Sequence, residues 1–240
     1  MCRLRLLLAV CTALFSPPAL ALALAEAEVI AALRLASTGN IADAVDEATG
    51  QSGFMQHDMK PIFKSKFVGR AVTAQLRRVL RNDPRNYPNH ALEILDQAPP
   101  GSVLVYVLED GLNIAGMGNL MATTAKVRGL AGAVIDGGVR DIEEVTAIGF
   151  PVFSRSVTPA TSVGRLVAVT KNQTVIAGRV RVVPGDYIVA DWDGVVVVPQ
   201  DAAERVVELI RQYDQKEVKM IPIIKETGSM LKALEIYNRY

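Results

Sequence analysis

The densest group of polar side chains within apolar surroundings is Ile135-Asp136-Gly137-Gly138-Val139-Arg140-Asp141. It follows an apolar run and precedes a helical pattern, so in an open α/β sheet it lies at the carboxyl end of a strand, where ligands bind. Arg140 offers a planar fork for a substrate carboxylate, and Asp141 caps the following helix while still presenting its own carboxylate. The opposing interpretation is a tight turn with a capping Asp and a solvated Arg.

A second glycine-rich segment, Gly116-Met117-Gly118-Asn119-Leu120-Met121, precedes another helical pattern. Unpaired N–H groups at a helix start, together with the helix dipole, bind anions. The segment lacks the Lys-Ser/Thr of a phosphate-binding loop and the glycine spacing of a dinucleotide site. If both segments close strand–helix units, Arg140 and the N–H groups of Gly118 to Met121 hold the two ends of one small carboxylate.

The composition excludes several other classes of protein. Half of the 240 residues are hydrophobic, which provides a sizeable core and excludes a disordered chain. The net charge of +1 gives no footprint for nucleic acid, so no nucleic-acid partner is expected. Two Cys and two His are too few for the usual zinc sites. We interpret Asp186, Asp191 and Asp193, which fall at expected hairpin turns, as structural.

Residues 1–25 have the pattern of a secretory signal peptide, which leaves residues 26–240 as the folded domain. Arg3 and Arg5 precede an apolar run that ends at Ser16-Pro17-Pro18, and alternating Ala and Leu residues follow. Cleavage near residue 23 or 25 predicts an exported, periplasmic or secreted protein without cysteine and without a membrane contact. The alternatives are an anchoring helix, or a start codon placed too far upstream in a cytoplasmic protein.

The centre of the chain predicts alternating strands and helices with short connections. Buried strands are expected at 103–108, 131–135 and 150–153, and helices at 119–128 and 142–148. This order indicates a parallel α/β layer. Both polar segments would follow strands of that layer.

The flanking regions complete a single mixed α/β domain. Helices are predicted at 26–37 and 91–98, and a further short helix is predicted with Asn40 as its N-cap. A strand is predicted at 67–76 and a polar loop at 81–89. Short strands separated by turns between 166 and 199 indicate antiparallel hairpins. A long C-terminal helix from Asp201 to about Lys219, bent or ended by Pro222, precedes a last helix at 229–237.

Four motifs in this order resemble a known family. They are Gly69-Arg70-Ala71-Val72-Thr73, the segment 135–141, Phe150-Pro151-Val152-Phe153, and the stretch from Pro184-Gly185-Asp186 to Pro199. Together they are similar to the family of the regulator of ribonuclease activity A and the class II pyruvate aldolases acting on 4-hydroxy-4-methyl-2-oxoglutarate. The resemblance covers nearly the whole chain after residue 25. It implies a swivelling β/β/α fold and a homotrimer or dimer of trimers with active sites between subunits.

The resemblance also implies roles for individual residues. The aldolases use an Arg-Asp pair for substrate and a divalent cation, which implies that Arg140 and Asp141 are catalytic and that Asp141 holds Mg²⁺ or Mn²⁺. The regulator lacks the acidic member of the pair. Glu217 matches an acidic residue that a neighbouring subunit contributes. Asn119 departs from an acid of the aldolases that looks like part of the proton relay, and Leu108-Glu109-Asp110-Gly111 departs from their usual Asp followed by glycines.

The function expected from these residues is that of a lyase. It would cleave 4-hydroxy-2-oxo acids to pyruvate with the help of a divalent cation, and would decarboxylate oxaloacetate as a side reaction. The alternative is a non-catalytic regulator that binds a partner on the same scaffold. A carboxylate in the substrate tail would need Arg155 or Arg165 nearby, unless both are solvated.

Overall fold

The computed structural model describes residues 18–79, 87 and 89–238, with side chains from residue 26 onward. Residues 1–17 of the predicted signal peptide, and most of the polar loop predicted at 81–89, lie outside the described residues. Within the described part of the chain, no helix is long and apolar enough to cross a lipid bilayer.

Seven helices and eleven strands are present in the described residues. The helices are α1 (Pro18–Leu35), α2 (Thr38–Thr49), α3 (His90–Gln97), α4 (Asn119–Val127), α5 (Ile142–Ile148), α6 (Ala203–Thr227) and α7 (Met230–Ile236), with a 3-10 turn at Gly111–Asn113. The strands are β1 (Lys60–Pro61), β2 (Phe67–Arg78), β3 (Val103–Leu108), β4 (Ala115–Met117), β5 (Gly132–Val139), β6 (Val152–Val157), β7 (Leu166–Ala168), β8 (Val175–Ala177), β9 (Val180–Val182), β10 (Tyr187–Ala190) and β11 (Val195–Val198).

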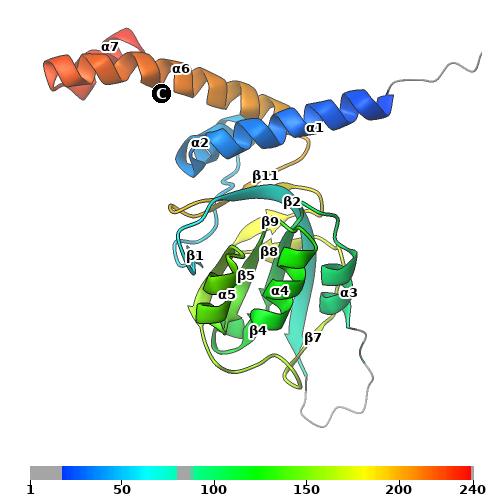
Figure 1. Ribbon diagram of the computed structural model, residues 1–240. Helices are drawn as coiled ribbons and strands as arrows, with labels where there is room; N and C mark the ends of the chain where they lie inside the picture. The colour runs from blue at the N-terminus through cyan, green and yellow to red at the C-terminus, as the bar shows by residue number, and fades with distance from the viewer. Residues whose placement is uncertain (1–17, 80–86, 88, 239–240) are drawn as a thin grey trace, which may run out of the picture.

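Nine of the strands form one curled mixed sheet. Its order is β1-β6-β5-β3-β2-β10-β11, with β4 beside β5 and β7 beside β2. Strands β2, β3, β5 and β6 run parallel to their neighbours in this series, and β10 joins β2 in the antiparallel sense. Helices α3, α4 and α5 cover one face of the parallel part (Figure 1). The predicted mixed α/β class and its parallel centre are confirmed.

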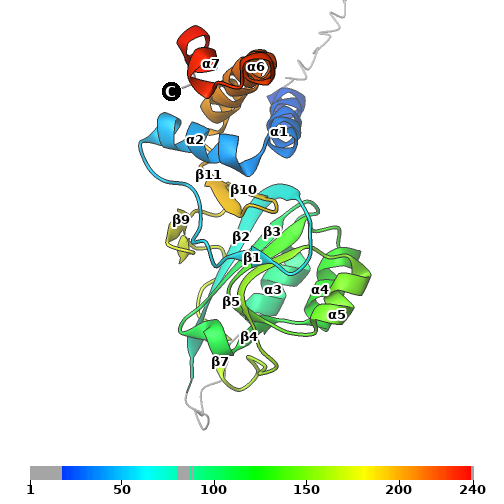
Figure 2. The same ribbon diagram turned by 90° about the vertical axis from the view of Figure 1, so that its left-hand side faces the viewer.

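The central strand β3 shows why this sheet is buried on both faces. Its apolar side chains alternate between two cores. Leu104 and Tyr106 pack beneath α3, α4 and α5, whereas Val103 and Val105 pack against Phe153 and the β8–β9 hairpin on the other face. Figure 2 shows the helices and the hairpin on opposite sides of the sheet. The sheet is therefore a rigid support for the loops at its edge.

A helical layer forms a third core at the β10–β11 end of the sheet. Helices α1, α2 and α6 pack there, with Leu33, Ile41 and Val206 buried against β10 and β11 (Figure 1). Helix α2 begins two residues before the predicted cap, because Ser37 rather than Asn40 accepts the capping N–H. The Asn40 side chain instead donates to Asp214 of α6, at 3.1 Å, and so links the two helices.

Other boundaries also differ from the expected ones. Strand β5 continues through the glycines to Val139, since β4, which was not predicted, pairs with its end. The hairpins β8–β9 and β10–β11 are confirmed, but β7 pairs with the distant β2. Helix α6 continues past Pro222, which is exposed, so that water is available to the carbonyl that proline leaves without its helical bond.

Candidate active site

The two glycine-rich segments meet at the carboxyl edge of the sheet. Strand β4 pairs in parallel with the end of β5, with Ala115 opposite Gly138 and Met117 opposite Val139. The Arg140 N–H then donates to the Met117 carbonyl, at 3.1 Å. The loop after β5 and the start of α4 are therefore adjacent, as the sequence predicted.

The carboxylate of Asp141 caps a different helix from the expected one. Asp141 precedes α5, but its backbone is left-handed (φ 56°) and its side chain makes no capping bond to α5. Oδ2 instead accepts the N–H of Asn119, the first residue of α4, at 3.0 Å. A carboxylate at a helix N-terminus is stabilised by the helix dipole. The Asn119 N–H, which the sequence analysis assigned to substrate binding, is therefore already bonded to the Asp141 carboxylate.

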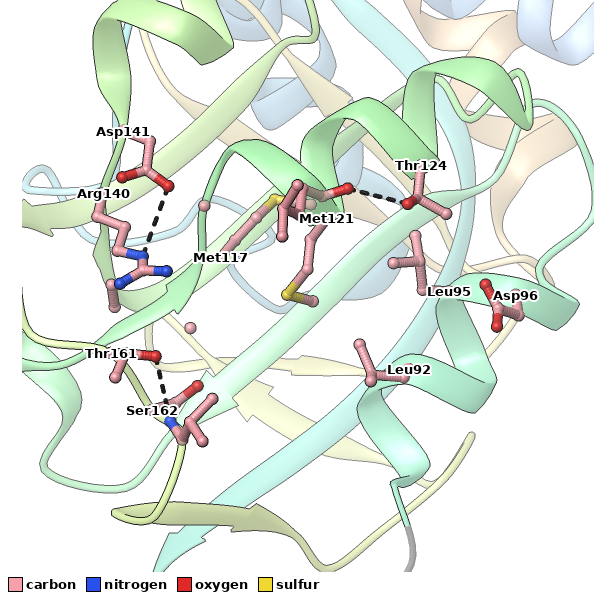
Figure 3. A pocket seen from close by; sticks show the side chains of 15 residues that line it. Leu92, Leu95, Asp96, Met117, Met121, Thr124, Arg140, Asp141, Thr161 and Ser162 are labelled. Carbon is pink, nitrogen blue, oxygen red and sulfur yellow. Dashed lines mark hydrogen bonds and ion pairs between the residues drawn. The ribbon is translucent and has the colours of Figure 1, made fainter.

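Arg140 and Asp141 lie side by side and remain accessible. The Arg140 Nε is 3.5 Å from the Asp141 Oδ2, and their side chains are 40% and 36% exposed. Figure 3 shows both side chains at one end of a cavity. Such a loosely held guanidinium keeps N–H donors for a ligand carboxylate or oxyanion.

Gly118 permits this close arrangement. A Cβ at position 118 would stand 2.6 Å from the Asp141 Oδ2 and 3.0 Å from the Arg140 Nε. Any side chain would therefore push the pair away from the start of α4. Glycine is required here because the Arg140 and Asp141 side chains approach its Cα closely, not because of its backbone conformation. Its extended backbone (φ −145°) is one that other residues also adopt.

The cavity beside the pair has a volume of about 420 Å³, which is enough for a small organic acid. Its lining comes from α3, β4, the start of α4, the loop after β5 and the loop before β7. The residues are Leu92, Leu95, Asp96, Ala115, Gly116, Met117, Gly118, Leu120, Met121, Thr124, Arg140, Asp141, Thr161, Ser162 and Val163. Of the predicted substrate-binding residues, the structure places Gly118, Leu120, Met121 and Arg140 in this wall.

Asn119 and Glu217 lie elsewhere. The Asn119 side chain accepts a hydrogen bond from Thr123 along α4, at 3.1 Å, and Asn119 does not line the cavity. Glu217 belongs to α6, whose helical neighbours are α1, α2 and α7, at the opposite end of the molecule from α4 and α5 (Figure 1). A single chain therefore does not bring Glu217 to the cavity, and its role at a site shared between subunits stays a prediction.

Arg155, considered for a substrate tail, belongs to a partly buried ion-pair cluster. It donates from Nε to Asp58, at 2.9 Å, and from Nη1 to Asp136, at 3.1 Å. Asp136 also accepts the Gly178 N–H, at 2.8 Å. The hydrogen bond with Asp58 raises the pKa of Arg155 and lowers that of Asp58. Nothing local in the sequence pairs Asp58 with residues 136 and 155, so this cluster was not predicted.

Two of the three hairpin aspartates, Asp186 and Asp191, have structural side-chain contacts, whereas Asp193 is exposed at its turn. Asp186 is buried and accepts the N–H groups of Val183, at 2.8 Å, and Gln200, at 3.2 Å. Burial raises the pKa of Asp186 despite these bonds. Asp191 accepts both the N–H and the hydroxyl of Thr38, which ties the turn after β10 to the start of α2.

The side chains in the cavity could supply only some of the ligands of a metal cation. The described residues form no group of three or more acidic, His or Cys side chains suited to a metal. Asp141 supplies one carboxylate beside Arg140. Mg²⁺ keeps several waters and is commonly held by one or two carboxylates together with its substrate. The site therefore fits a hydrated cation that Asp141 and a chelating substrate share.

Comparison with known proteins identifies one family, and the similar sequences and structures agree with it. The RraA-like family model, described as Aldolase/RraA, matches residues 38–197. A protein of Halalkalibacterium halodurans, provisionally named a 4-hydroxy-4-methyl-2-oxoglutarate aldolase, is 34% identical over an alignment of 190 residues, and the match covers 77% of this chain and 82% of that protein.

Two crystal structures share the fold. An uncharacterized protein from Pseudomonas syringae pv. tomato has a TM-score of 0.78 at 27% identity, over 88% of this chain and 94% of that one. RraAS2 of Streptomyces coelicolor, described as an unusual member of the RNase ES inhibitor RraA family, has a TM-score of 0.69 at 26% identity, over 82% and 96% of the two chains.

Proposed function

Because the chain belongs to the Aldolase/RraA family, we propose that it is a lyase that cleaves 4-hydroxy-2-oxo acids and releases pyruvate. The observation that supports this most directly is the accessible Arg140–Asp141 pair, held against the N-terminus of α4 in a cavity of about 420 Å³. The same chemistry predicts decarboxylation of oxaloacetate, since both reactions produce the pyruvate enolate.

In this proposal the substrate loses the proton of its 4-hydroxyl group and the C3–C4 bond breaks. The bonding electrons pass to C3 as the pyruvate enolate, the other fragment leaves as a carbonyl compound, and C3 then takes up a proton. Arg140 donates hydrogen bonds to the enolate oxygen or the carboxylate, where negative charge develops. The N–H groups of Leu120 and Met121, at the start of α4, orient the other end of the pyruvate unit.

Asp141 has two tasks in this arrangement. Its Oδ2 accepts the Asn119 N–H, which fixes the carboxylate against α4 and beside Arg140. The carboxylate would also hold Mg²⁺ or Mn²⁺ with waters and the substrate. When bound, such a cation supplies Lewis-acid stabilisation of the 2-oxo group.

The proton of the 4-hydroxyl needs an acceptor, for which we propose Glu217 of a neighbouring copy in a homotrimer or a dimer of trimers. A carboxylate is a suitable general base when it reaches the proton directly or through one water. Glu217→Gln is expected to lower pyruvate release from the assembled protein and to have no effect on dissociated chains. If Glu217→Gln lowered pyruvate release equally in assembled and dissociated protein, Glu217 would not act at a site shared between subunits.

The test of the function combines an assay with a binding measurement. Pyruvate release is measured from 4-hydroxy-4-methyl-2-oxoglutarate and from oxaloacetate, with Mg²⁺ or Mn²⁺. Calorimetry with Mn²⁺ then compares the wild type, Asp141→Asn and the control Asp193→Asn, which alters an exposed turn. We expect only Asp141→Asn to weaken Mn²⁺ binding and pyruvate release. A wild-type protein that releases no pyruvate from either acid would refute the lyase.

A regulator that binds a partner on the same scaffold is the second candidate. It is favoured by the structural similarity to RraAS2 and by the Asn119 side chain, which is bonded to Thr123 instead of facing the cavity. Capture of a protein partner together with a silent pyruvate assay would support it. We also propose export after cleavage near residue 25, for which N-terminal sequencing of the mature protein is the test.

A further inference from the structure

We propose that Ser156 and Thr158 are positioning residues that fix the register of β4 against β5. The register matters because the Arg140–Asp141 pair directly follows β5. This inference rests on the proposed lyase, and it concerns two residues outside the lining of the cavity beside the pair. Ser156 lies in β6, and Thr158 comes directly after that strand. Both residues act on the backbone of the site and not on the substrate.

The pairing of β4 with β5 is short and irregular. Ala115 lies opposite Gly138, whereas Met117 lies opposite Val139, so two steps along β4 match one step along β5. A bulge of this kind disrupts the ladder locally. Register is also weakly specified where strands are rich in glycine, as both strands are here. Contacts from outside the two strands are therefore needed to fix their alignment.

The alignment of β4 determines where the Arg140–Asp141 pair lies. The Met117 carbonyl accepts the Arg140 N–H, at 3.1 Å. Gly118 follows β4 directly, and a Cβ there would stand 2.6 Å from the Asp141 Oδ2. A slip of β4 by one residue would move both this carbonyl and the start of α4 relative to the pair. The guanidinium of Arg140 would then be displaced from the developing oxyanion.

The hydroxyl groups of Ser156 and Thr158 supply contacts of the required kind. They donate to the carbonyls of Leu112 and Asn113, respectively, and the second bond measures 3.3 Å. Both carbonyls belong to the turn that leads into β4. The Thr158 N–H also donates to the Val139 carbonyl at the end of β5, at 2.9 Å. Thr158 therefore ties the end of β5 to the segment that precedes β4.

Gly138 leaves room for these two side chains to cross β5. It lies opposite Ser156 in the β5–β6 ladder. A Cβ at position 138 would stand 2.6 Å from the Thr158 Cγ2 and 3.1 Å from the Ser156 Oγ. The threonine methyl therefore packs over the glycine while the hydroxyl reaches the turn. Thr158→Val keeps a methyl for this contact and removes the hydroxyl.

The same hydroxyl also acts at the outer edge of β4. The Thr158 Oγ1 accepts the Ala160 N–H, at 3.4 Å, and the Ala160 carbonyl accepts the Ala115 N–H, at 2.7 Å. The Ser162 N–H donates to the Ala115 carbonyl, at 3.2 Å. The backbone bonds of Ala115 remain possible in a side-chain variant. We therefore expect β4 to stay paired in such a variant and only its alignment to loosen.

The first experiment measures pyruvate release from oxaloacetate by the intact protein with Mg²⁺. Thr158→Val is expected to lower kcat about tenfold, and Ser156→Ala combined with it about 10²-fold, because a small misplacement of an aligning group is costly. Thr158→Ser, which keeps the hydroxyl, should retain most of the rate. The matched control is Thr49→Val, which removes a half-buried hydroxyl from the Val45 carbonyl in α2 and should leave kcat unchanged. An unchanged kcat in the double variant would overturn the inference.

Combination with Arg140→Ala shows whether Thr158 acts through Arg140. If the hydroxyl positions the arginine, Thr158→Val is expected to cost only about twofold or less in the Arg140→Ala background, because the two residues are energetically coupled. The same loss in both backgrounds would overturn the inference, since Thr158 would then act independently of Arg140.

Hydrogen exchange separates this inference from the lyase itself. If the wild type releases no pyruvate, the proposed function fails, and exchange resolved to single amides decides the inference. The Arg140 amide, which is bonded to Met117, is expected to exchange about tenfold faster or more in Thr158→Val, whereas the Val105 amide in β3 keeps its rate. Equal protection of Arg140 in the two proteins would reject the inference. Faster exchange of both amides would also reject it, because the whole fold would then be destabilised.

Discussion

Arg140 and Arg155 are both arginines beside aspartates, and they have opposite surroundings. Arg155 is held by Asp58 and Asp136 from two other segments, and its side chain is 23% exposed. Arg140 has a longer contact, 3.5 Å, to the adjacent Asp141, and its side chain is 40% exposed. The first arginine has its charge balanced within the protein, whereas the second retains donors that face a cavity.

The difference gives a criterion for choosing which of the two arginines is the candidate functional residue. Residue type and strand-end position fit both, since Arg155 lies on β6 and Arg140 follows β5. What separates them is the number of carboxylates within reach and the access to a cavity. We therefore expect Arg155 to contribute to stability and Arg140 to chemistry, and four predictions test this division.

The largest expected effect is that of Arg140→Ala on the proposed lyase. Loss of one charged donor to a developing oxyanion typically reduces the rate by about 10²–10³. The melting temperature is expected to stay close to that of the wild type, because the Arg140 side chain is 40% exposed and its contact with Asp141 is long, at 3.5 Å. Arg140→Lys should recover only part of the rate, since an ammonium lacks the planar fork. Full activity of the Ala variant would make Arg140 a solvated surface residue.

Arg155→Ala is expected to have the reverse profile. Its removal leaves the Asp58 and Asp136 carboxylates without their shared partner, and we expect a loss of roughly 1–3 kcal/mol in the free energy of unfolding. Urea denaturation measures this loss, and pyruvate release per folded molecule should change little. A large drop in rate at unchanged stability would contradict the division between the two arginines.

Asn119→Asp would make the Arg140 site resemble the Arg155 cluster, with a second carboxylate, if the new side chain turns from Thr123 toward the cavity. An Asp at position 119 can accept a proton at neutral pH, which Asn cannot, so we expect pyruvate release to rise several-fold. The matched control is Thr123→Val, which removes the hydroxyl that donates a hydrogen bond to the Asn119 side chain. If Asn119→Asp is no faster, or slower, the relay assigned to this position is wrong and the added carboxylate immobilises Arg140.

The smallest effect concerns pH and the Arg155 cluster. The hydrogen bond from Arg155 holds the pKa of Asp58 below its ordinary value. Its stabilising contribution is therefore complete above the ordinary value and is lost as the pH falls through the folded-state pKa. Between about pH 5 and pH 2, the wild type should lose more unfolding free energy than Asp58→Asn. Parallel curves for the two proteins would show that this pair contributes nothing.

The elements whose signals are local were predictable from the sequence. Strand β3 has its expected bounds because its apolar run ends before Glu109, and helix α5 has its expected bounds because Gly149 caps its C-terminus. The meeting of the two glycine-rich loops was also predictable, since both segments follow parallel strands. The cavity residues Gly118, Leu120, Met121 and Arg140 follow from that juxtaposition.

Features that depend on distant partners were not predictable. The left-handed backbone at Asp141 turns its carboxylate from α5 to α4, and no pattern in the sequence encodes that choice. The three residues of β7 are too few for a periodic signal, and their partner β2 lies some ninety residues earlier. The α3 side of the cavity, with Leu92, was missed because its leucines have ordinary core spacing.

Strand β2 also determines the order in which the chain can fold. One edge of β2 pairs with β3, the next strand along the chain, while β7 and β10 pair with it across about 90 to 120 residues. Closing the longer loops costs more chain entropy, and contacts of high sequence separation slow folding. We therefore expect the segment 103–157, with the loops of the candidate site, to acquire its pairing before the 166–198 region docks on β2. The Arg140–Asp141 pair would then be assembled on a nascent sheet whose outer edge is still open.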